Sequence, residues 1–273
     1  MTIRPRVDRT WAEPTSAVRR AAVLGVPLFV GTADAAVDTI LAAATDGVGG
    51  YACFCNVHVM VTAQRDPDVM RALCGARMVL PDGAPIAWLL RHQGHPAAAR
   101  VCGPDMMDRV LADPASRDRV RHYLLGSTPM VLDRLVTEIE GRYPQAAIAG
   151  RMSPGIAGLV DIDRQIDVAS ISRTRPDIVW CALGAPKQEL WMLRNADALR
   201  PSLVLGVGAA FDFLAGTLAR APIWMQDHGL EWLHRAATEP RRLLPRYLST
   251  NTRFLGYVTR DALARRGAGG SAS

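Results

Sequence analysis

Short apolar runs alternate with amphipathic stretches over most of the chain, and this alternation limits the possible fold more than any other feature. The apolar runs predict strands at 21–30 (with a hairpin around Gly25 as the alternative), 51–55, 77–80, 122–125, 146–149, 177–183 and 203–207. The amphipathic stretches predict helices at 33–45, 58–75, 83–92, 104–112, 128–141, 161–174 and 186–199. Thr32 and Thr128 stand where helix N-caps are expected. Strands that alternate with helices predict an α/β fold with parallel strands and helices on both faces.

The pattern changes after Gly216, where no further strand is predicted. Residues 235–266 contain eight arginines against only Glu239 and Asp261. The apolar side chains there fit one face of a helix. We therefore expect four parts, which are a flexible N-terminal arm (1–20), a catalytic α/β domain (21–216), a helical basic C-terminal appendage (217–266) and a disordered tail (267–273).

The charge of the chain indicates an anionic partner. The formal net charge is +6 and the isoelectric point is about 9.4. Nucleotides, phosphates, nucleic acids and membrane surfaces all fit such a charge. Lys187 is the only lysine, and codon usage explains the excess of arginine better than function does. No apolar run reaches the roughly 18 to 20 residues that span a bilayer, so any membrane contact is expected to be peripheral. The five cysteines include no C-x-x-C pair, which favours a reducing compartment.

Polar or glycine residues follow the predicted strands at several of their carboxyl ends. They are Asn56, Asp82, Gly126 with Ser127, the segment 187–189, and Asp212. Open parallel sheets bind ligands beyond these ends, so the set predicts a ligand site. Helix caps and turns are the alternative explanation for any single member.

The stretch "WCALGAPKQELW" (180–191) is the most informative of these ends. Gly184 permits a tight exit from the strand, and Pro186 suits the first turn of a helix. Lys187 and Gln188 would then lie beside free backbone N–H groups at the positive end of the helix dipole. This arrangement predicts an anion site in which Gln188 recognises a polar edge of the ligand. A capped helix with solvated charges is the alternative.

Six segments carry a resemblance to a known family. In chain order they are "LPDGAPIAWLLR", "RVCGPDMM", "YLLGSTPMVLDRL", "DIVWCALGAPKQELWMLRN", "GVGAAFDFLAG" and "RAPIWMQDHGLEWLHRAATEPRRLLPRY". The chain resembles the WecG/TagA/CpsF family of bacterial glycosyltransferases from about residue 21 to 250. The resemblance implies a Rossmann-like fold with a C-terminal appendage near the membrane. It also implies inverting transfer of a sugar from a UDP-sugar to an acceptor linked to undecaprenyl diphosphate, in the synthesis of exopolysaccharide, capsule or cell-wall polymer.

The same resemblance implies roles for individual residues. Asp82 matches the catalytic base, which takes the proton of the acceptor hydroxyl group, and Arg100 matches a basic residue near the diphosphate. Asn56 and Gln188 match residues of the donor pocket, and Asp212 matches an acidic residue near the nucleoside. The arginines of the appendage that match residues completing the site are Arg235, Arg242 and Arg246.

Two departures put details of the substrate in doubt. Many relatives have Thr-Pro before the pocket asparagine, whereas Phe54 and Cys55 precede Asn56 here. Many relatives also have Gly-Tyr-Phe after the fifth strand, where this chain has "SPGIAG" at 153–158. The donor sugar, the acceptor sugar and the linkage are therefore not specified by the sequence.

Several motifs suggest other chemistry but have simpler interpretations. The "DID" at 161–163 has the form of a metal-binding Asp-x-Asp motif, yet a helix start explains it better, and we expect no metal cofactor. "GVGAAF" at 206–211 matches only half of a dinucleotide fingerprint, which argues against an oxidoreductase. Trp180 and Trp191 are expected in the core. A catalytically silent protein that binds nucleotide sugars or docks on membranes is the remaining alternative.

The expected partners follow from this interpretation. They are a UDP-sugar, a lipid-diphosphate-linked acceptor and an anionic membrane surface, without nucleic acid, and a homo-oligomer is compatible with the sequence. The expected location is the inner face of the plasma membrane, on its cytoplasmic side.

Overall fold

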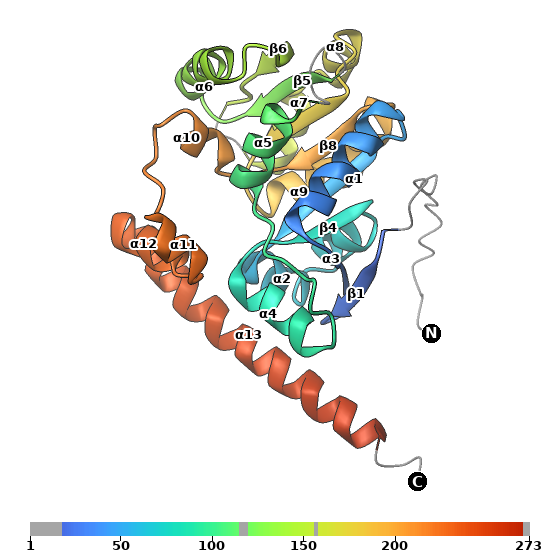
Figure 1. Ribbon diagram of the computed structural model, residues 1–273, viewed down its shortest axis with the longest axis vertical. Helices are drawn as coiled ribbons and strands as arrows, with labels where there is room; N and C mark the ends of the chain where they lie inside the picture. Colours follow the sequence, from blue (N-terminus) through green and yellow to red (C-terminus); the bar gives the residue numbers. More distant parts are fainter. Residues whose placement is uncertain (1–17, 115–119, 156–157, 270–273) are drawn as a thin grey trace.

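A computed structural model describes residues 18–114, 120–155 and 158–269, and its main feature is a six-stranded parallel sheet in the order β4-β3-β8-β7-β5-β6 (Figure 1). Its strands are β3 (Gly50–Cys55), β4 (Met78–Pro81), β5 (Arg121–Gly126), β6 (Ala147–Met152), β7 (Ile178–Ala182) and β8 (Leu203–Gly206). A separate antiparallel hairpin joins β1 (Arg20–Val23) to β2 (Val26–Phe29) around Gly25. The predicted parallel sheet and the hairpin are thus confirmed.

Alternate residues of the central strands enter two different cores, because successive side chains of a strand point to opposite faces. On β3, Cys53 and Cys55 lie in one apolar cluster, and Ala52 and Phe54 lie in the other. Strands that are covered on both faces consist almost entirely of apolar residues, which explains why their sequences are short apolar runs rather than alternating patterns. Trp180 and Trp191 are both fully buried, as predicted.

Helices cover both faces of the sheet, as the alternation predicts. They are α1 (Ala33–Thr45), α2 (Val57–Ala63), α3 (Pro67–Cys74), α4 (Ala84–His92), α5 (Gly103–Ala112), α6 (Pro129–Arg142), α7 (Leu159–Gln165), α8 (Val168–Arg173), α9 (Lys187–Asn195) and α10 (Ala210–Leu214), with a 3-10 turn η2 (Ala196–Leu199) after α9. The Thr32 and Thr128 side chains cap α1 and α6 by accepting hydrogen bonds from Ala35 N and Val131 N.

Two long helices of the sequence prediction are each two shorter helices. The predicted 58–75 helix breaks where Asp66 caps α3 and Pro67 begins it, because proline has no N–H group for a continuing helix. The predicted 161–174 helix breaks where Asp167 caps α8 by accepting from Ser170 N.

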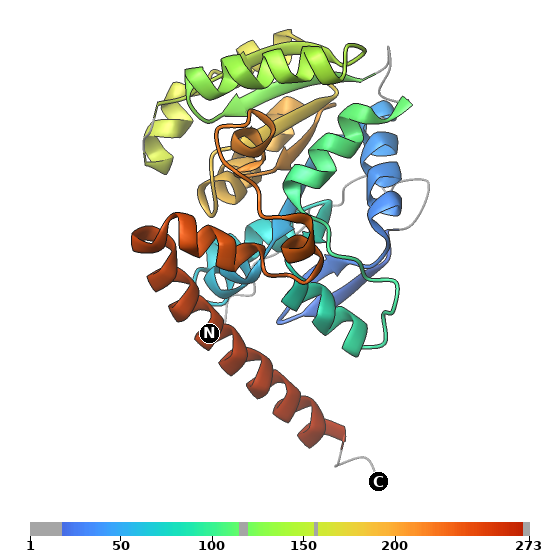
Figure 2. The same cartoon turned by 60° about the vertical axis from the view of Figure 1, so that its left-hand side comes forward.

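The C-terminal segment, defined here as residues 217–269, is helical and packs against the rest of the described chain (18–216), which is called the sheet domain below. Its helices are α11 (Ile223–Asp227), α12 (Glu231–Thr238) and α13 (Pro240–Gly269). Helix α13 lies against α2 and α12 and then continues well past the body of the molecule (Figures 1 and 2). Leu243 and Phe254 anchor it, since both side chains are buried. No helix among the described residues is long and apolar enough to cross a membrane.

The ends of the chain differ from the predicted boundaries. Arg20 belongs to strand β1 rather than to an N-terminal arm, and residues 267–269 belong to α13 rather than to a tail. The rest of the predicted arm and tail, residues 1–17 and 270–273, lies outside the described residues, as do residues 156–157 of the "SPGIAG" motif.

Candidate active site

A pocket of about 1370 Å³ lies between the carboxyl ends of the strands and the C-terminal segment. Residues that follow β3, β4, β5, β7 and β8 form its floor, and α12 and α13 contribute one wall. Pockets of this kind are expected where the strand order of an open parallel sheet reverses. The pocket brings together most of the residues predicted from the sequence, which are Asn56, Asp82, Arg100, Gly184, Lys187, Gln188, Asp212 and Arg235.

Asp82 lies at the floor of this pocket, directly after β4. Helix α4 begins two residues later, at Ala84, and Gly83 is its N-cap without a side-chain hydrogen bond, so the carboxyl group of Asp82 does not cap the helix. Burial raises the pKa of Asp82 to about 6, while nearby Arg100 and a hydrogen bond from the Asn56 amide favour the charged form. A carboxyl group with such a pKa is suited to accept a proton near neutral pH.

Asn56 combines two functions at the end of β3. Its Oδ1 caps α2 by accepting a hydrogen bond from Val59 N at 3.1 Å, and its side chain also hydrogen-bonds to Asp82. Since Oδ1 accepts from the helix, the amide NH₂ is the group that faces the carboxylate. The capping interpretation of this residue is therefore confirmed, and its role toward a donor stays a prediction.

Gln188 has protein partners rather than a free edge that faces a ligand. Its Nε2 donates to Gly206 O at 2.8 Å and to Glu189 Oε1 at 3.0 Å. Its Oε1 accepts from Gly208 N at 3.1 Å, and only 3% of the residue is exposed. Gln188 therefore stabilises the loop after β8 through these hydrogen bonds. The predicted recognition of a ligand edge by both of its polar groups does not fit this arrangement.

The two glycines predicted at the site have different surroundings. Gly184 lines the pocket with a φ of +79°, as expected for a tight exit from β7. Gly126 does not line the pocket. A Cβ atom on it would lie 2.5 Å from Ala182 O, so glycine is needed there for the close approach of β5 to β7. The next two residues, Ser127 and Thr128, line the pocket instead.

Asp212 on α10 and Arg235 on α12 both line the pocket. Burial raises the pKa of Asp212, while a hydrogen bond from the Thr217 hydroxyl group opposes this. The guanidinium group of Arg235 lies over the Phe213 ring, 5.7 Å from its centre, and this stacking fixes its direction. Arg242 lies on α13, but its side chain and that of Arg246 are outside the described part of the structure.

Sequence reasoning missed the acidic and aromatic residues that the C-terminal segment supplies. Glu231, Trp232 and Tyr247 line the pocket beside residues of the sheet domain. Glu231 binds Arg100, from which it is separated by 131 residues in sequence. The only signal for such a contact was an acidic residue at the edge of a strongly basic segment, which by itself does not indicate its partner.

The Asp-x-Asp motif lies outside the pocket, whereas residues 206–209 of the "GVGAAF" motif line it. Asp163 of the "DID" motif forms an ion pair with Arg194, and Asp161 lies in the first turn of α7, whose N-cap is Gly158. Neither aspartate lines the pocket. Among the described residues, no group of three or more His, Cys, Asp or Glu side chains is placed to hold a metal ion. Of the six histidines, His58 lines the pocket.

The fold and the pocket define an α/β enzyme whose candidate acid-base group, Asp82, lies beside the cationic Arg100 at the ends of parallel strands. Residues 21–268 match the model of the glycosyl transferase WecG/TagA/CpsF family, and the chain belongs to this family. The resemblance noted in the sequence is thereby confirmed, and the protein is a glycosyltransferase of the hexosyltransferase class.

Several named enzymes are similar to this chain over most of its length. It is 30% identical over 208 residues to the N-acetylglucosaminyldiphosphoundecaprenol N-acetyl-beta-D-mannosaminyltransferase of Bacillus subtilis (strain 168), which covers 74% of this chain and 79% of that protein. The enzyme of the same name from Bacillus spizizenii is 28% identical over 74% of this chain and 78% of its own length. The enzyme of the same name from Staphylococcus aureus (strain NCTC 8325 / PS 47) is 27% identical over 62% of this chain and 64% of its own length.

Proposed function

We propose that the protein transfers a sugar from a UDP-sugar to a saccharide carried on undecaprenyl diphosphate, with inversion at the anomeric carbon. The names of the relatives support the acceptor class and make an N-acetylhexosamine the first donor sugar to test. The product would enter a cell-wall polymer, a capsule or an exopolysaccharide. The observation that carries the proposal is the carboxyl group of Asp82 on the pocket floor, with its pKa raised to about 6 and Arg100 nearby.

In the proposed reaction Asp82 acts as the general base. Its carboxylate takes the proton of the acceptor hydroxyl group as the acceptor oxygen forms a bond to C1 of the donor sugar. The bond between C1 and the phosphate oxygen breaks, and its electron pair leaves with UDP. A single displacement of this kind inverts the configuration at C1. Asn56 orients the carboxylate through the hydrogen bond between their side chains.

We infer that the charge on the leaving diphosphate is met by cationic side chains without a divalent metal. Arg100, Lys187 and Arg235 all line the pocket, and Lys187 lies in the first turn of α9, where the helix dipole also favours an anion. Preorganised cations of this kind stabilise charge that develops in a transition state. Turnover that stops with a chelator and returns with magnesium or manganese would contradict this inference.

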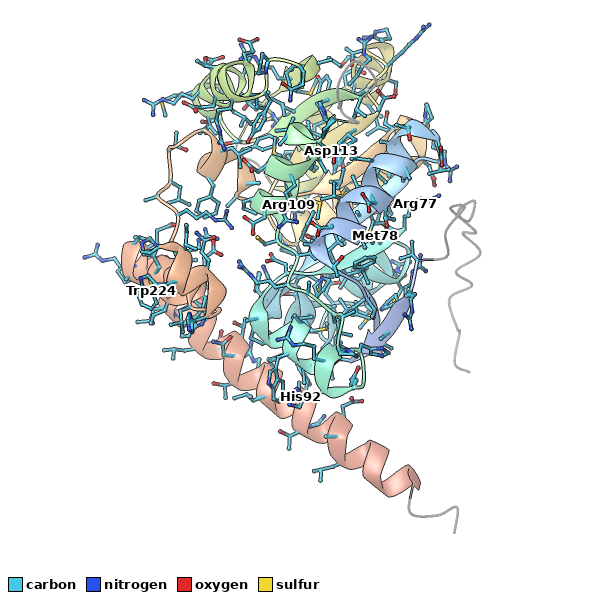
Figure 3. The ribbon with its side chains drawn as sticks, viewed as in Figure 1. Arg77, Met78, His92, Arg109, Asp113 and Trp224 are labelled. Atoms are coloured by element: carbon cyan, nitrogen blue, oxygen red, sulfur yellow. The ribbon has the colours of Figure 1, made fainter. Side chains whose placement is uncertain are left out.

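We also infer that the protein works at the inner face of the plasma membrane, on which the C-terminal segment docks. Large apolar side chains are exposed on this segment, including Trp224 on α11 (60%; Figure 3) and Leu248 and Leu255 on α13 (63% and 65%). Arginines lie on the same segment. Exposed apolar side chains beside basic ones are suited to anionic interfaces. A polyprenyl acceptor stays in the bilayer, so the enzyme has to approach it there.

The proposal is tested by incubating the protein with a panel of UDP-sugars and lipid-diphosphate acceptors and measuring released UDP. We expect release that requires both substrates, beginning with UDP-N-acetylhexosamines and an N-acetylglucosaminyl diphosphate lipid. UDP binding without release for any pair would favour the alternative of a silent binding protein.

A further inference from the structure

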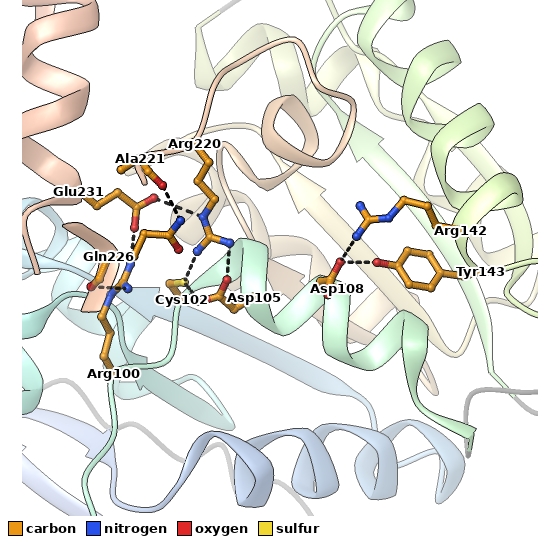
Figure 4. Close-up of polar contacts among 10 residues, drawn as sticks. All are labelled: Arg100, Cys102, Asp105, Asp108, Arg142, Tyr143, Arg220, Ala221, Gln226 and Glu231. Carbon is orange, nitrogen blue, oxygen red and sulfur yellow. Dashed lines mark hydrogen bonds and ion pairs between the residues drawn. The ribbon is translucent and has the colours of Figure 1, made fainter. Parts of the chain in front are cut away.

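Four charged side chains of alternating sign link the sheet domain to the C-terminal segment through ion pairs (Figure 4). Arg100, in the loop before α5, binds Glu231 at the start of α12. Glu231 also faces Arg220, which in turn binds Asp105 on α5. Two residues of each charge therefore join the two parts of the chain beside the candidate active site.

Glu231 is shared between two arginines through its two carboxylate oxygens. Its Oε2 accepts a hydrogen bond from Arg100 Nη2, and its Oε1 lies 3.7 Å from Arg220 Nε. The side chain of Glu231 is only 15% exposed, against 22% for Arg100 and 28% for Arg220. Ion pairs at such partly buried positions are screened less than those on the open surface.

The two arginines are held differently. Arg220 has a second anchor on the sheet domain, because its Nη1 pairs with Asp105 Oδ1 and its Nη2 contacts Cys102 Sγ at 3.5 Å. The other hydrogen bond recorded for Arg100 is a long one, from Nη1 to Gln226 O at 3.4 Å. Glu231 thus has one partner that is fixed by α5 and one that depends mainly on Glu231 itself.

Arg100 and Glu231 both line the pocket, together with Asp82. A diphosphate that enters the pocket brings negative charge next to the carboxylate of Glu231. An arginine binds an anion best through two parallel N–H groups. Nη2 of Arg100 keeps a second N–H group while it donates one to Glu231, but the Glu231 carboxylate then competes with a diphosphate for the same guanidinium group. Glu231 retains Arg220 as a neutralising partner when Arg100 turns away.

We propose that Glu231 is a positioning residue that holds Arg100 in the empty pocket and releases it to the donor diphosphate, with Arg220 keeping Glu231 in place. This inference rests on the proposed function, since it takes the donor to be a nucleoside diphosphate sugar. It assigns to α12 a direct influence on donor affinity, in addition to its place in the pocket wall.

The test is a double-mutant cycle on UDP binding, measured by calorimetry at low salt with the full chain. The four proteins are the wild type, Glu231→Gln, Arg100→Gln and the double variant. We expect Glu231→Gln to lower the dissociation constant of UDP by about threefold to tenfold, because this change removes the carboxylate that competes with UDP for Arg100. In the Arg100→Gln background the same change is expected to have little effect, since the gain acts through Arg100.

Each contrary outcome has a distinct meaning. Unchanged or weaker UDP binding in Glu231→Gln, or equal gains in both backgrounds, overturns the exchange of partners. Unchanged UDP binding in Arg100→Gln removes Arg100 from the donor site and overturns this inference but not the transferase reaction. No UDP binding by the wild type overturns the proposed donor as well.

Two further variants guard against trivial explanations. Asp133→Asn removes one negative charge from an exposed ion pair with Arg151, outside the pocket lining, and is expected to leave UDP binding unchanged. Arg220→Gln removes the second partner of Glu231, which should then hold Arg100 more firmly and weaken UDP binding. This opposite sign remains testable if Glu231→Gln does not fold, and tighter UDP binding by Arg220→Gln would contradict the proposal.

Discussion

At the scale of single residues, the buried carboxyl groups of Asp82 and Glu189 both have raised pKa values but different surroundings. Asp82 faces the pocket and has Arg100 and Asn56 nearby, with a pKa of about 6. Glu189 is fully buried below the pocket, and burial raises its pKa to about 7, although a hydrogen bond from Gln188 opposes the rise. We assign proton transfer to Asp82 and a structural effect to Glu189.

The pKa of Asp82 predicts the acid limb of the pH profile. The carboxylate form is the base, so kcat/KM should increase as pH rises through about 6 and level off above pH 7, because the profile of kcat/KM reports groups of the free enzyme. Initial rates of UDP release between pH 5 and 8 measure this directly. A profile that is flat over this range would remove Asp82 as the titrating base.

Glu189 predicts a pH dependence of stability. Its folded-state pKa of about 7 lies above its ordinary value of 4.5, so the stability that the neutral form provides is complete below about pH 4.5 and is lost as pH rises through 7. Glu189→Gln cannot ionise, and its unfolding free energy relative to the wild type should increase by on the order of 3 kcal/mol between these limits. Urea unfolding at several pH values checks this.

The control for this experiment is Glu138→Gln, which removes an exposed glutamate of α6. If Glu189→Gln and Glu138→Gln show the same pH dependence as the wild type, Glu189 is ionised throughout and the account of its burial is wrong.

Periodicity predicted only some of the site residues, whereas Arg100 and Arg235 were predicted from the family resemblance. Asn56, Asp82 and Asp212 come directly after apolar runs or near them, and the ends of parallel strands meet at one edge of a sheet. The partners of Gln188 could not be predicted in this way, because Gly206 and Gly208 lie 18 and 20 residues further along the chain. Contacts of this kind depend on how the elements pack.

At the scale of elements, α13 determines how the C-terminal segment meets its surroundings. Its sequence predicted one helical face, and the structure divides the apolar residues of that face. Phe254 is buried at 6% exposure, whereas Leu248 and Leu255 are 63% and 65% exposed. Whether a side chain of α13 is buried depends on the helices that pack against it, which are α2 and α12. The periodicity of the sequence does not show where these helices lie.

These two groups of side chains predict opposite effects of substitution. Replacing Leu248 and Leu255 together by Ser should leave thermal unfolding almost unchanged and abolish sedimentation with anionic vesicles at low salt. Phe254→Ala should instead cost about 3 kcal/mol of stability, because it leaves a cavity. Vesicle sedimentation and thermal unfolding of both variants separate the outcomes. Full-length protein that ignores anionic vesicles would contradict membrane docking.

At the scale of the whole molecule, one pocket is built from two distant parts of the chain. The sheet domain supplies the candidate base and Arg100, and the C-terminal segment supplies Glu231, Trp232 and Arg235. Helix α13 then extends away from the body (Figure 2). This arrangement places the proposed membrane contact on the segment that also forms one wall of the proposed site of transfer, so that a lipid-linked acceptor and a water-borne donor meet between the two parts.

The most direct test of this account is the transfer of labelled sugar to a lipid-diphosphate acceptor by the wild type and by Asp82→Asn, with UDP binding measured on the same preparations. An amide keeps the shape of the carboxylate but cannot accept the proton. We predict labelled lipid with the wild type and none with Asp82→Asn. The UDP dissociation constants should agree within about threefold, which is less than about 1 kcal/mol, because the proposed partner of Asp82 is the acceptor hydroxyl group and not UDP. Turnover by Asp82→Asn at the rate of the wild type would contradict the central claim that Asp82 is the general base.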